Sequence, residues 1–162
     1  MLKYRPVQEA DISTICQFPQ SESELFFMYP KACYPLTYEQ LKKAIEQRSD
    51  STVVLSDDRI SGFANFYICE PGEKCAIGNV VVAPEARGKG IGRYIIQTMI
   101  QFAFDKHKVK EVQISCFNQN TAGLLLYPKL GFRPFAIEAR VNKQGGRVAL
   151  IHMRMSASER GS

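Results

Sequence analysis

A glycine-rich segment between a predicted strand and a predicted helix constrains the fold of this chain more than any other stretch. Residues 80–82 are three consecutive valines, which favour an extended strand, and Pro84 ends its hydrogen-bonded ladder. Three glycines then occur within residues 88–92. Glycine tolerates positive φ and close backbone approach, and a helix beginning at Ile91 would direct its first N–H groups toward a ligand. The segment predicts a turn that binds phosphate, with a plain β-to-α turn carrying solvated basic residues as the alternative.

The length and composition of the chain predict one globular domain. Its 162 residues can bury a substantial core, and its hydrophobic content of 45% is ordinary. No apolar run approaches the roughly 20 residues of a membrane span, and residues 1–6 are typical of a strand rather than a signal peptide. We expect a single domain over residues 1–155, followed by a short polar tail at residues 156–162.

Charge and cysteine content narrow the class of partner. The net charge of +5 comes without a basic run interleaved with aromatic residues, which favours a small anionic ligand over nucleic acid. The five cysteines are scattered and form no Cys-x-x-Cys pair, so the sequence predicts neither a zinc site nor a disulfide framework. We expect a cytoplasmic protein in a reducing setting that binds neither nucleic acid nor membranes.

The predicted order of elements is a mixed sheet covered by helices rather than a repeating βαβ unit. That order argues against a dinucleotide-binding fold, as does the lack of a Gly-x-Gly-x-x-Gly pattern. Residues 19–35 are predicted to be an irregular aromatic segment, and Thr37 with Gln40 predicts a capped helix start. The expected strands are 2–6, 51–56, 60–69, 75–83, 109–117, 132–142 and 147–155, and the expected helices are 7–18, 37–48, 90–107 and 118–130.

Two motifs in the chain resemble those of the GNAT N-acetyltransferase superfamily. Residues Arg87-Gly88-Lys89-Gly90-Ile91-Gly92 resemble its Arg/Gln-x-x-Gly-x-Gly/Ala pyrophosphate loop. Residues 120–132 resemble its second signature, an asparagine and an alanine followed by Leu-Tyr-x-Lys-Leu-Gly-Phe. The resemblance spans roughly residues 2–155. It implies a GNAT-like α/β fold, with a mostly antiparallel, six- to seven-stranded mixed sheet, a central splayed strand pair and about four flanking helices.

The resemblance also implies acetyl-CoA as cofactor and transfer of an acetyl group to a nitrogen. The backbone of residues 80–82 would pair with the pantetheine arm, as an added strand does at a sheet edge, and Gly78 would permit a bulge there. Tyr127 matches the general acid that protonates the departing thiolate, since its reference pKa near ~10 keeps it protonated. The cofactor-binding residues implied are Val80, Val81, Val82, Arg87, Gly88, Lys89, Gly90, Ile91, Gly92, Arg93, Asn120 and Tyr127.

Several of these roles have structural alternatives. Asn120 matches a cofactor contact, yet it could cap the helix instead, although Asn118 is the better cap candidate. Tyr127 could be a core tyrosine. Pro128 stands where the family commonly has a polar residue, and it should kink or stop the helix. We expect a kink, because residues 130–132 still complete the motif.

The acceptor half of the site is less well specified by the sequence. Glu70 is a candidate general base, with a solvated turn residue or a water relay as alternatives. The candidate acceptor pocket is aromatic, or else a hydrophobic loop on the core, and comprises Phe26, Phe27, Tyr29 and Tyr34. No metal is needed, because the thioester is already activated. We expect a monomer or homodimer that acetylates a primary amine of a small molecule or peptide in a ternary complex. The alternatives are acetylation of a protein N-terminus or lysine, and a non-catalytic acyl-CoA sensor.

Overall fold

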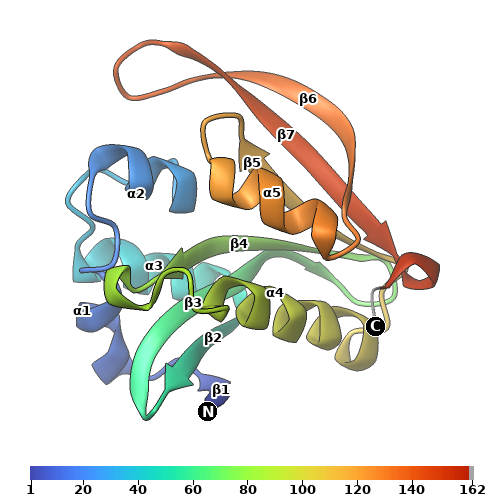
Figure 1. The fold of residues 1–162 in the computed structure, drawn as a ribbon, viewed down its shortest axis with the longest axis horizontal. Helices are drawn as coiled ribbons and strands as arrows, with labels where there is room; N and C mark the ends of the chain where they lie inside the picture. Colours follow the sequence, from blue (N-terminus) through green and yellow to red (C-terminus); the bar gives the residue numbers. More distant parts are fainter. Residues whose placement is uncertain (161–162) are drawn as a thin grey trace.

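The computed structural model describes residues 1–160, which contain a seven-stranded sheet flanked by helices (Figure 1). The spatial order of the strands is β1-β2-β3-β4-β5-β7-β6, and among these strands only β4 and β5 pair in parallel. This architecture confirms the predicted α/β class and mixed sheet. The strands are β1 (Leu2–Pro6), β2 (Ser49–Ser56), β3 (Arg59–Glu70), β4 (Lys74–Val82), β5 (Glu111–Phe117), β6 (Arg133–Val141) and β7 (Arg147–Ser156).

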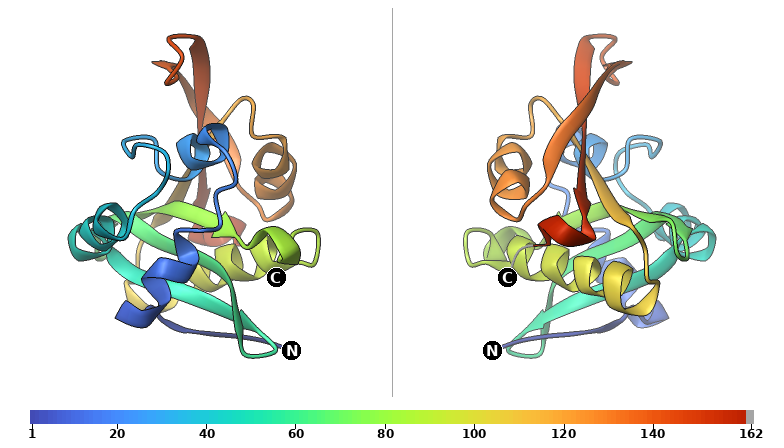
Figure 2. Two further views of the ribbon diagram at one scale, coloured as in Figure 1. Left: turned by 90° about the vertical axis from the view of Figure 1, so that its left-hand side faces the viewer. Right: turned by 90° about the vertical axis from the view of Figure 1, so that its right-hand side faces the viewer.

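Five α-helices lie within the described residues, and α3 and α4 flank opposite faces of the central strands (Figure 2). The Thr37 hydroxyl accepts a hydrogen bond from Gln40 N at 3.3 Å, which confirms the predicted start of α3. None of these helices combines the length and apolar character needed to cross a membrane. The helices are α1 (Ile12–Ile15), α2 (Glu22–Met28), α3 (Tyr38–Gln47), α4 (Ile91–Gln101), which continues as a π-helical turn (Phe102–Lys106), and α5 (Thr121–Lys129).

Three predicted segments differ from the structure. The helix expected over residues 7–18 is a 3₁₀ turn (Glu9–Asp11) followed by the four residues of α1. The segment 19–35 is not irregular, because it contains α2, whose N-cap Ser21 accepts from Glu24 N at 3.1 Å. A serine three residues before a glutamate starts a helix, and the neighbouring prolines fall outside it. The predicted tail also packs on the domain in part, since Arg160 pairs with Asp105 at 2.8 Å. Residues 161–162 lie outside the described residues.

Two apolar clusters hold the elements together. The larger joins the sheet to α1, α3 and α4 and includes the fully buried Phe63, Phe66 and Met99. The smaller packs Phe26 of α2 against Phe117 of β5, with ring centroids 4.4 Å apart, and adds Val148 and Leu150 of β7. The smaller cluster therefore fixes α2 beside the C-terminal end of β5 and the start of β7.

The central parallel pair separates part-way along its length. Pairing between β4 and β5 runs from Lys74 opposite Glu111 to Ile77 opposite Ile114, whereas β4 continues to Val82. On its other side, β4 stays paired with β3, but with one extra residue between Gly78 and Val81. This bulge bends β4 away from β5. The predicted splayed pair is confirmed.

Asn79, rather than Gly78, supplies the unusual backbone of the bulge. Asn79 has a φ of +52°, in the left-handed region that asparagine tolerates better than most residues. Gly78 is needed for space instead, since a Cβ there would lie 2.7 Å from the Tyr67 ring.

The buried side chain of Asn79 links three elements at the bulge. Its Nδ2 donates to the Met28 carbonyl of α2 at 3.1 Å, and its Oδ1 accepts from Asn65 Nδ2 of β3 at 2.9 Å. Asn79 is 2% exposed, so neither contact can be replaced readily by water. The bulge and the position of α2 therefore depend on one amide group.

We predict that Asn79→Ala lowers the free energy of unfolding by about 2–4 kcal/mol, because buried polar partners are left unsatisfied and alanine is strained at positive φ. Asp58→Ala is a matched control, because Asp58 has a φ of +65° but is exposed in a turn. The control should lose only about 1 kcal/mol. Urea unfolding measures both, and equal losses would contradict a role for the buried amide.

Candidate functional site

Three elements meet where β4 separates from β5: the end of β4, the start of α4, and α5. A Cβ at Gly92 of α4 would lie 3.6 Å from Leu126 of α5 and 3.9 Å from Val82 of β4, in ordinary contact. Beyond Ile77, the edge of β4 that faces β5 has left its ladder, and residues 80–82 lie on this stretch. Such an edge presents backbone groups that an extended ligand can pair with.

The glycine loop leads into an α4 N-terminus that no side chain caps. Gly88 and Gly90 have φ values of +77° and +84°, and a Cβ at either position would meet no atom within 4 Å. Gly90 is the N-cap, so the N–H groups of Ile91 and Gly92 lack both an intrahelical acceptor and a side-chain cap. Lys89 and Arg93 are exposed beside them. This arrangement suits an anion, because free N–H groups and the helix dipole act together.

Arg87 braces this loop from the side of α2. Its guanidinium holds Glu24 through two bonds of 2.8 and 3.0 Å, and it also donates to the Phe18 carbonyl at 3.1 Å. The bonds from Arg87 lower the pKa of Glu24 below its usual value, against an opposing effect of burial. The Arg87 side chain therefore ties the loop to the α2 region instead of pointing freely toward an anion.

Tyr127 is buried in α5 close to the end of β5. The side chain is 6% exposed, and its ring lies edge-on to Phe132 at 6.3 Å. Burial raises the pKa of Tyr127, so its hydroxyl keeps its proton at neutral pH. In residues 1–160 no enclosed polar side-chain atom lacks a partner, and the Tyr127 hydroxyl makes no hydrogen bond there. The hydroxyl therefore reaches accessible space.

Gly123 permits the close approach of α5 to β5. A Cβ at this position would lie 2.8 Å from Cys116 Sγ and 3.1 Å from the Tyr127 ring. Burial raises the pKa of the Cys116 thiol to about 12, so this cysteine is a poor nucleophile. Of Cys116 and Tyr127, Tyr127 is the better candidate for a proton donor.

The expected division of roles between two asparagines is wrong in one respect. Asn120, not Asn118, caps α5, since its Oδ1 accepts from Gly123 N at 3.2 Å. Asn118 instead extends the β5–β7 ladder, where its Oδ1 accepts from Ala149 N at 2.9 Å. Strand pairing outweighed the local capping preference.

Pro128 does not end α5, which continues to Lys129. The chain then closes tightly, because Leu130 N and Phe132 N both donate to the Tyr127 carbonyl, at 3.1 and 3.2 Å. Gly131, with a φ of +110°, follows the last helical turn. The Leu-Gly-Phe ending thus holds the backbone of Tyr127 in place despite the proline.

Glu70 does not lie at the opening. It is exposed at the end of β3 and pairs with Lys74, at the opposite end of β4 from the bulge. The five residue steps from Lys74 to Asn79 span about 16 Å of strand. The geometry does not support Glu70 as a general base, because a base must reach the reacting nitrogen directly or through one water.

The four aromatic residues expected to line one pocket lie in three places. Phe26 and Phe27 face Phe117 at the end of β5. Tyr29 packs on the guanidinium of Arg48, at 5.4 Å. Tyr34 is exposed and lines a separate cavity of about 430 Å³ between α1 and the start of α3. Phe26 and Phe27 lie in α2, whereas Tyr29 is its C-cap and Tyr34 lies in the segment between α2 and α3.

Comparison with known proteins decides the family. The family model described as "Acetyltransferase (GNAT) family" matches residues 14–132, which is more than half of the chain. The chain belongs to the GNAT family. This match includes the glycine loop, the bulge in β4 and Tyr127.

Curated GNAT relatives match over a part of their length. An N-acetyltransferase 9-like protein of Caenorhabditis elegans is 33% identical over 86 residues, which are 52% of this chain and 36% of that protein. The mycothiol acetyltransferase of Tsukamurella paurometabola is 32% identical over 78 residues, 48% of this chain and 26% of that protein. The matched segments thus span about a third or less of these relatives.

Solved structures share the GNAT fold over almost the whole chain. The spermidine N-acetyltransferase of Vibrio cholerae, in complex with CoA and spermine, superposes with a TM-score of 0.81, 16% identity and coverage of 98% and 96%. The ribosomal-protein-alanine N-acetyltransferase of Brucella melitensis has a TM-score of 0.79, 21% identity and coverage of 95% and 99%. At these identities the likeness concerns the fold.

The GNAT fold of this chain brings together polar residues that the sequence did not single out. Arg48, at the end of α3, lies between the rings of Tyr29 and Tyr67, at 5.4 and 5.6 Å, and donates to Asn65 Oδ1 at 3.3 Å. Burial lowers the pKa of Arg48, yet a guanidinium stays charged at neutral pH. The sequence contains one indication of this polar cluster. Asn65 and Asn79 lie inside predicted strands, where asparagine is disfavoured.

We predict a pH-dependent contribution from the Arg87–Glu24 pair to folding stability. Glu24→Gln should cost less than about 1 kcal/mol at pH 7, because both side chains are partly exposed. Arg87 lowers the pKa of Glu24 in the folded state below its ordinary value of 4.5. The stabilisation by the pair is therefore complete at a pH above that ordinary value, and it disappears as the pH falls through the lowered pKa.

Urea unfolding from pH 7 to pH 3 measures the difference between wild type and variant. Glu22→Gln is the control, because Glu22 lies in the same first turn of α2 but contacts the Gln144 amide. A Glu24→Gln difference that grows toward low pH would contradict the assignment.

Proposed function

We propose that this protein transfers the acetyl group of acetyl-CoA to a primary amine by direct attack in a ternary complex. The observation that carries the proposal is the opening between β4 and β5, which has an uncapped helix N-terminus at one end and Tyr127 beside it. Membership of the GNAT family and the CoA present in a solved structure of the same fold support the choice of cofactor.

The residues of the glycine loop fit a pyrophosphate. The first N–H groups of α4 have no side-chain cap, and the space beside Gly88 and Gly90 is open. Lys89 and Arg93 would add charge, whereas Arg87 keeps the loop in place through Glu24. The backbone of residues 80–82 would pair with the amide groups of the cofactor arm. Asn120 caps α5 through Oδ1, so its amide nitrogen could donate a hydrogen bond to the cofactor.

Tyr127 would supply the proton that the departing sulfur needs. Acetyl-CoA, when bound, provides an activated acetyl group and a thiol leaving group. The raised pKa of Tyr127 keeps its hydroxyl protonated at neutral pH, so a proton is available there. The thiolate that forms when the C–S bond breaks would take this proton, and solvent would then reprotonate the tyrosine oxygen. The high pKa of the Cys116 thiol disfavours an acyl-cysteine route, in agreement with direct transfer.

The acceptor must lose a proton before it attacks, and β4 provides no carboxylate for this step. Residues 76–82 of β4 contain one polar side chain, Asn79, and its amide is occupied by Asn65 and Met28. We infer that water held by backbone carbonyls at the bulge removes the proton. The Arg48 guanidinium would repel a second positive charge on the acceptor and attract a negative one. Acceptors that carry a carboxylate beside the amine should therefore be preferred.

One of the two solved neighbours is named for spermidine and the other for a ribosomal-protein alanine. Both a small amine and a peptide N-terminus are therefore acceptors to test for this chain. Thiol release from acetyl-CoA across both classes, with and without a neighbouring carboxylate, would identify the class. Tight CoA binding with no turnover on any acceptor would support a non-catalytic sensor instead.

We predict that Tyr127→Phe lowers kcat at least 100-fold while KM for acetyl-CoA stays within a few fold, because about 10²–10⁴ is typical for the loss of a general acid. Steady-state thiol release with the best acceptor gives both parameters. Tyr34→Phe is the control, because Tyr34 is exposed at a separate cavity. Unchanged kcat in Tyr127→Phe would exclude the tyrosine as the acid.

We predict that Gly90→Ala weakens CoA binding at least 10-fold, about 1.4 kcal/mol. The reason is that a Cβ would enter the anion site and alanine is strained at a φ of +84°. Gly145→Ala is the matched control, since Gly145 has a φ of +82° and equally open surroundings but lies in the β6–β7 turn. Calorimetric titration with CoA measures both, and equal affinities would contradict the loop assignment.

A further inference from the structure

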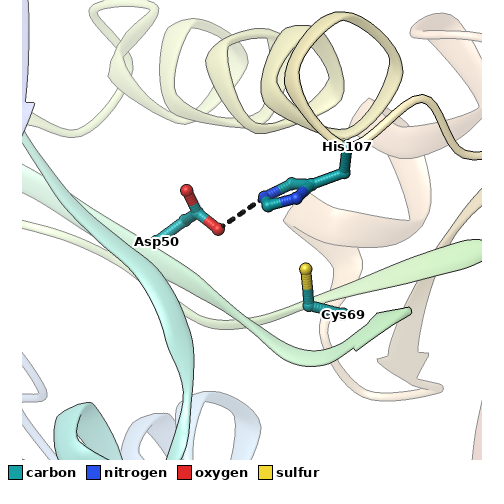
Figure 3. Close-up of side chains that lie close together, drawn as sticks. All are labelled: Asp50, Cys69 and His107. Carbon is teal, nitrogen blue, oxygen red and sulfur yellow. Dashed lines mark hydrogen bonds and ion pairs between the residues drawn. The ribbon is translucent and has the colours of Figure 1, made fainter. Parts of the chain in front are cut away.

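Asp50, Cys69 and His107 form a compact cluster of metal-ligating side chains outside the cleft (Figure 3). They come from the start of β2, the end of β3 and the residue after the π-helical turn. One ligand atom of each lies within 4.8 Å of the other two. Figure 3 shows the Asp50 carboxylate directed at the His107 ring and the Cys69 sulfur pointing toward the same space.

A fourth donor lies next to Cys69. Cys75 is its cross-strand partner on β4, and the two sulfurs are 3.8 Å apart. In a tetrahedral zinc site with Zn–S bonds of about 2.3 Å, two sulfurs lie about 3.8 Å apart. The two thiols thus already have the separation that a shared zinc ion requires.

Asp50 and His107 lie close to the spacing of two zinc ligands, whereas the Cys75 sulfur lies outside the group whose ligand atoms are within 4.8 Å of one another and would have to move inward with the ion. Asp50 Oδ2 and His107 Nε2 are 2.8 Å apart, whereas oxygen and nitrogen ligands of one zinc ion lie about 3.3 Å apart. Asp50 is held with a φ of +55°, and its side chain is 7% exposed. The carboxylate therefore already lies inside the cluster in the absence of an ion.

The surrounding contacts match those that orient metal ligands. Lys106 Nζ binds Asp50 Oδ1 at 2.6 Å, whereas Oδ2 faces His107 and also accepts a hydrogen bond from Ser49 Oγ at 2.5 Å. Two thiolates and one carboxylate would exceed the charge of Zn²⁺ by one, and Lys106 would balance that excess. The Lys106 side chain is 61% exposed, so it can adjust as the ion enters.

We propose that Asp50, Cys69, Cys75 and His107 bind one Zn²⁺ ion as a closed, structural site. Binding would release the two thiol protons, and the ligands would join β2, β3, β4 and the end of α4. A site with four protein ligands leaves no position for substrate, so its role is stability rather than catalysis. It lies at the paired end of β4, since Cys75 is opposite Val112 and precedes the separation after Ile77.

Cobalt and zinc titrations of the full chain test the proposal. The chain is first treated with chelator and reductant, and the metal is then added to the desalted protein. We expect one Co²⁺ per chain, with the visible bands of a tetrahedral site and thiolate-to-cobalt charge transfer, all lost on addition of Zn²⁺. At free Zn²⁺ of 100 times Kd, the equilibrium constant for folding should rise about 100-fold.

The variants Cys69→Ser and His107→Gln should each lose the cobalt bands and the stabilisation by zinc. Their circular dichroism without metal should match that of the wild type, which separates loss of the site from loss of the fold. Cys33→Ser is the control, because Cys33 is an exposed thiol in the loop before α3 and should leave both readouts unchanged.

Three results would overturn the site. The first is no stoichiometric metal uptake by the folded wild type. The second is equal uptake by wild type and Cys69→Ser, and the third is loss of uptake in Cys33→Ser. Thiol release from acetyl-CoA by the metal-free protein is measured in parallel, so that failure of the metal site and failure of the proposed acetyl transfer are distinguished.

Discussion

The separation of β4 from β5 rests on a buried amide at the bulge. Asn79 accepts the left-handed backbone that the extra residue imposes, and its side chain satisfies both Asn65 on β3 and a carbonyl of α2. A bulge in a central strand would otherwise leave buried polar groups unpaired, which is costly in a dry interior. One residue thus opens the sheet and places the helix that borders the opening.

The remaining parts of the site are positioned by contacts between elements distant in sequence. Arg87 joins the glycine loop to Glu24 of α2, and Gly123 lets α5 lie against Cys116 of β5. The helix N-terminus favours an anion at one end of the opening, and Arg48 places a half-buried cation near the bulge on the other side. We propose that the acetyl group is transferred in the space between the α4 N-terminus and Arg48.

The proposed zinc cluster uses the same strand at its other end. Cys75 and Asn79 are four residues apart on β4, one before the separation and one after it. An ion bound there would strengthen the paired end of the sheet without entering the opening. The sequence predicted no zinc site, because cysteines at positions 69 and 75 and a histidine at 107 follow no ligand spacing. Cross-strand pairing and the end of α4 bring them together.

Local patterns in the sequence determined most strands, the capped start of α3, the glycine loop and the motif around Tyr127, since each depends on neighbouring residues. Periodicity and the prolines gave an irregular segment in place of α2, and Asn118 was expected to cap α5. Only the tertiary structure decided the pairing of Asn118 with β7, the distance of Glu70 from the opening, and the environments of Asn79 and Arg48. These features depend on strand register and helix packing, which join residues far apart in the chain and leave no short-range pattern to read.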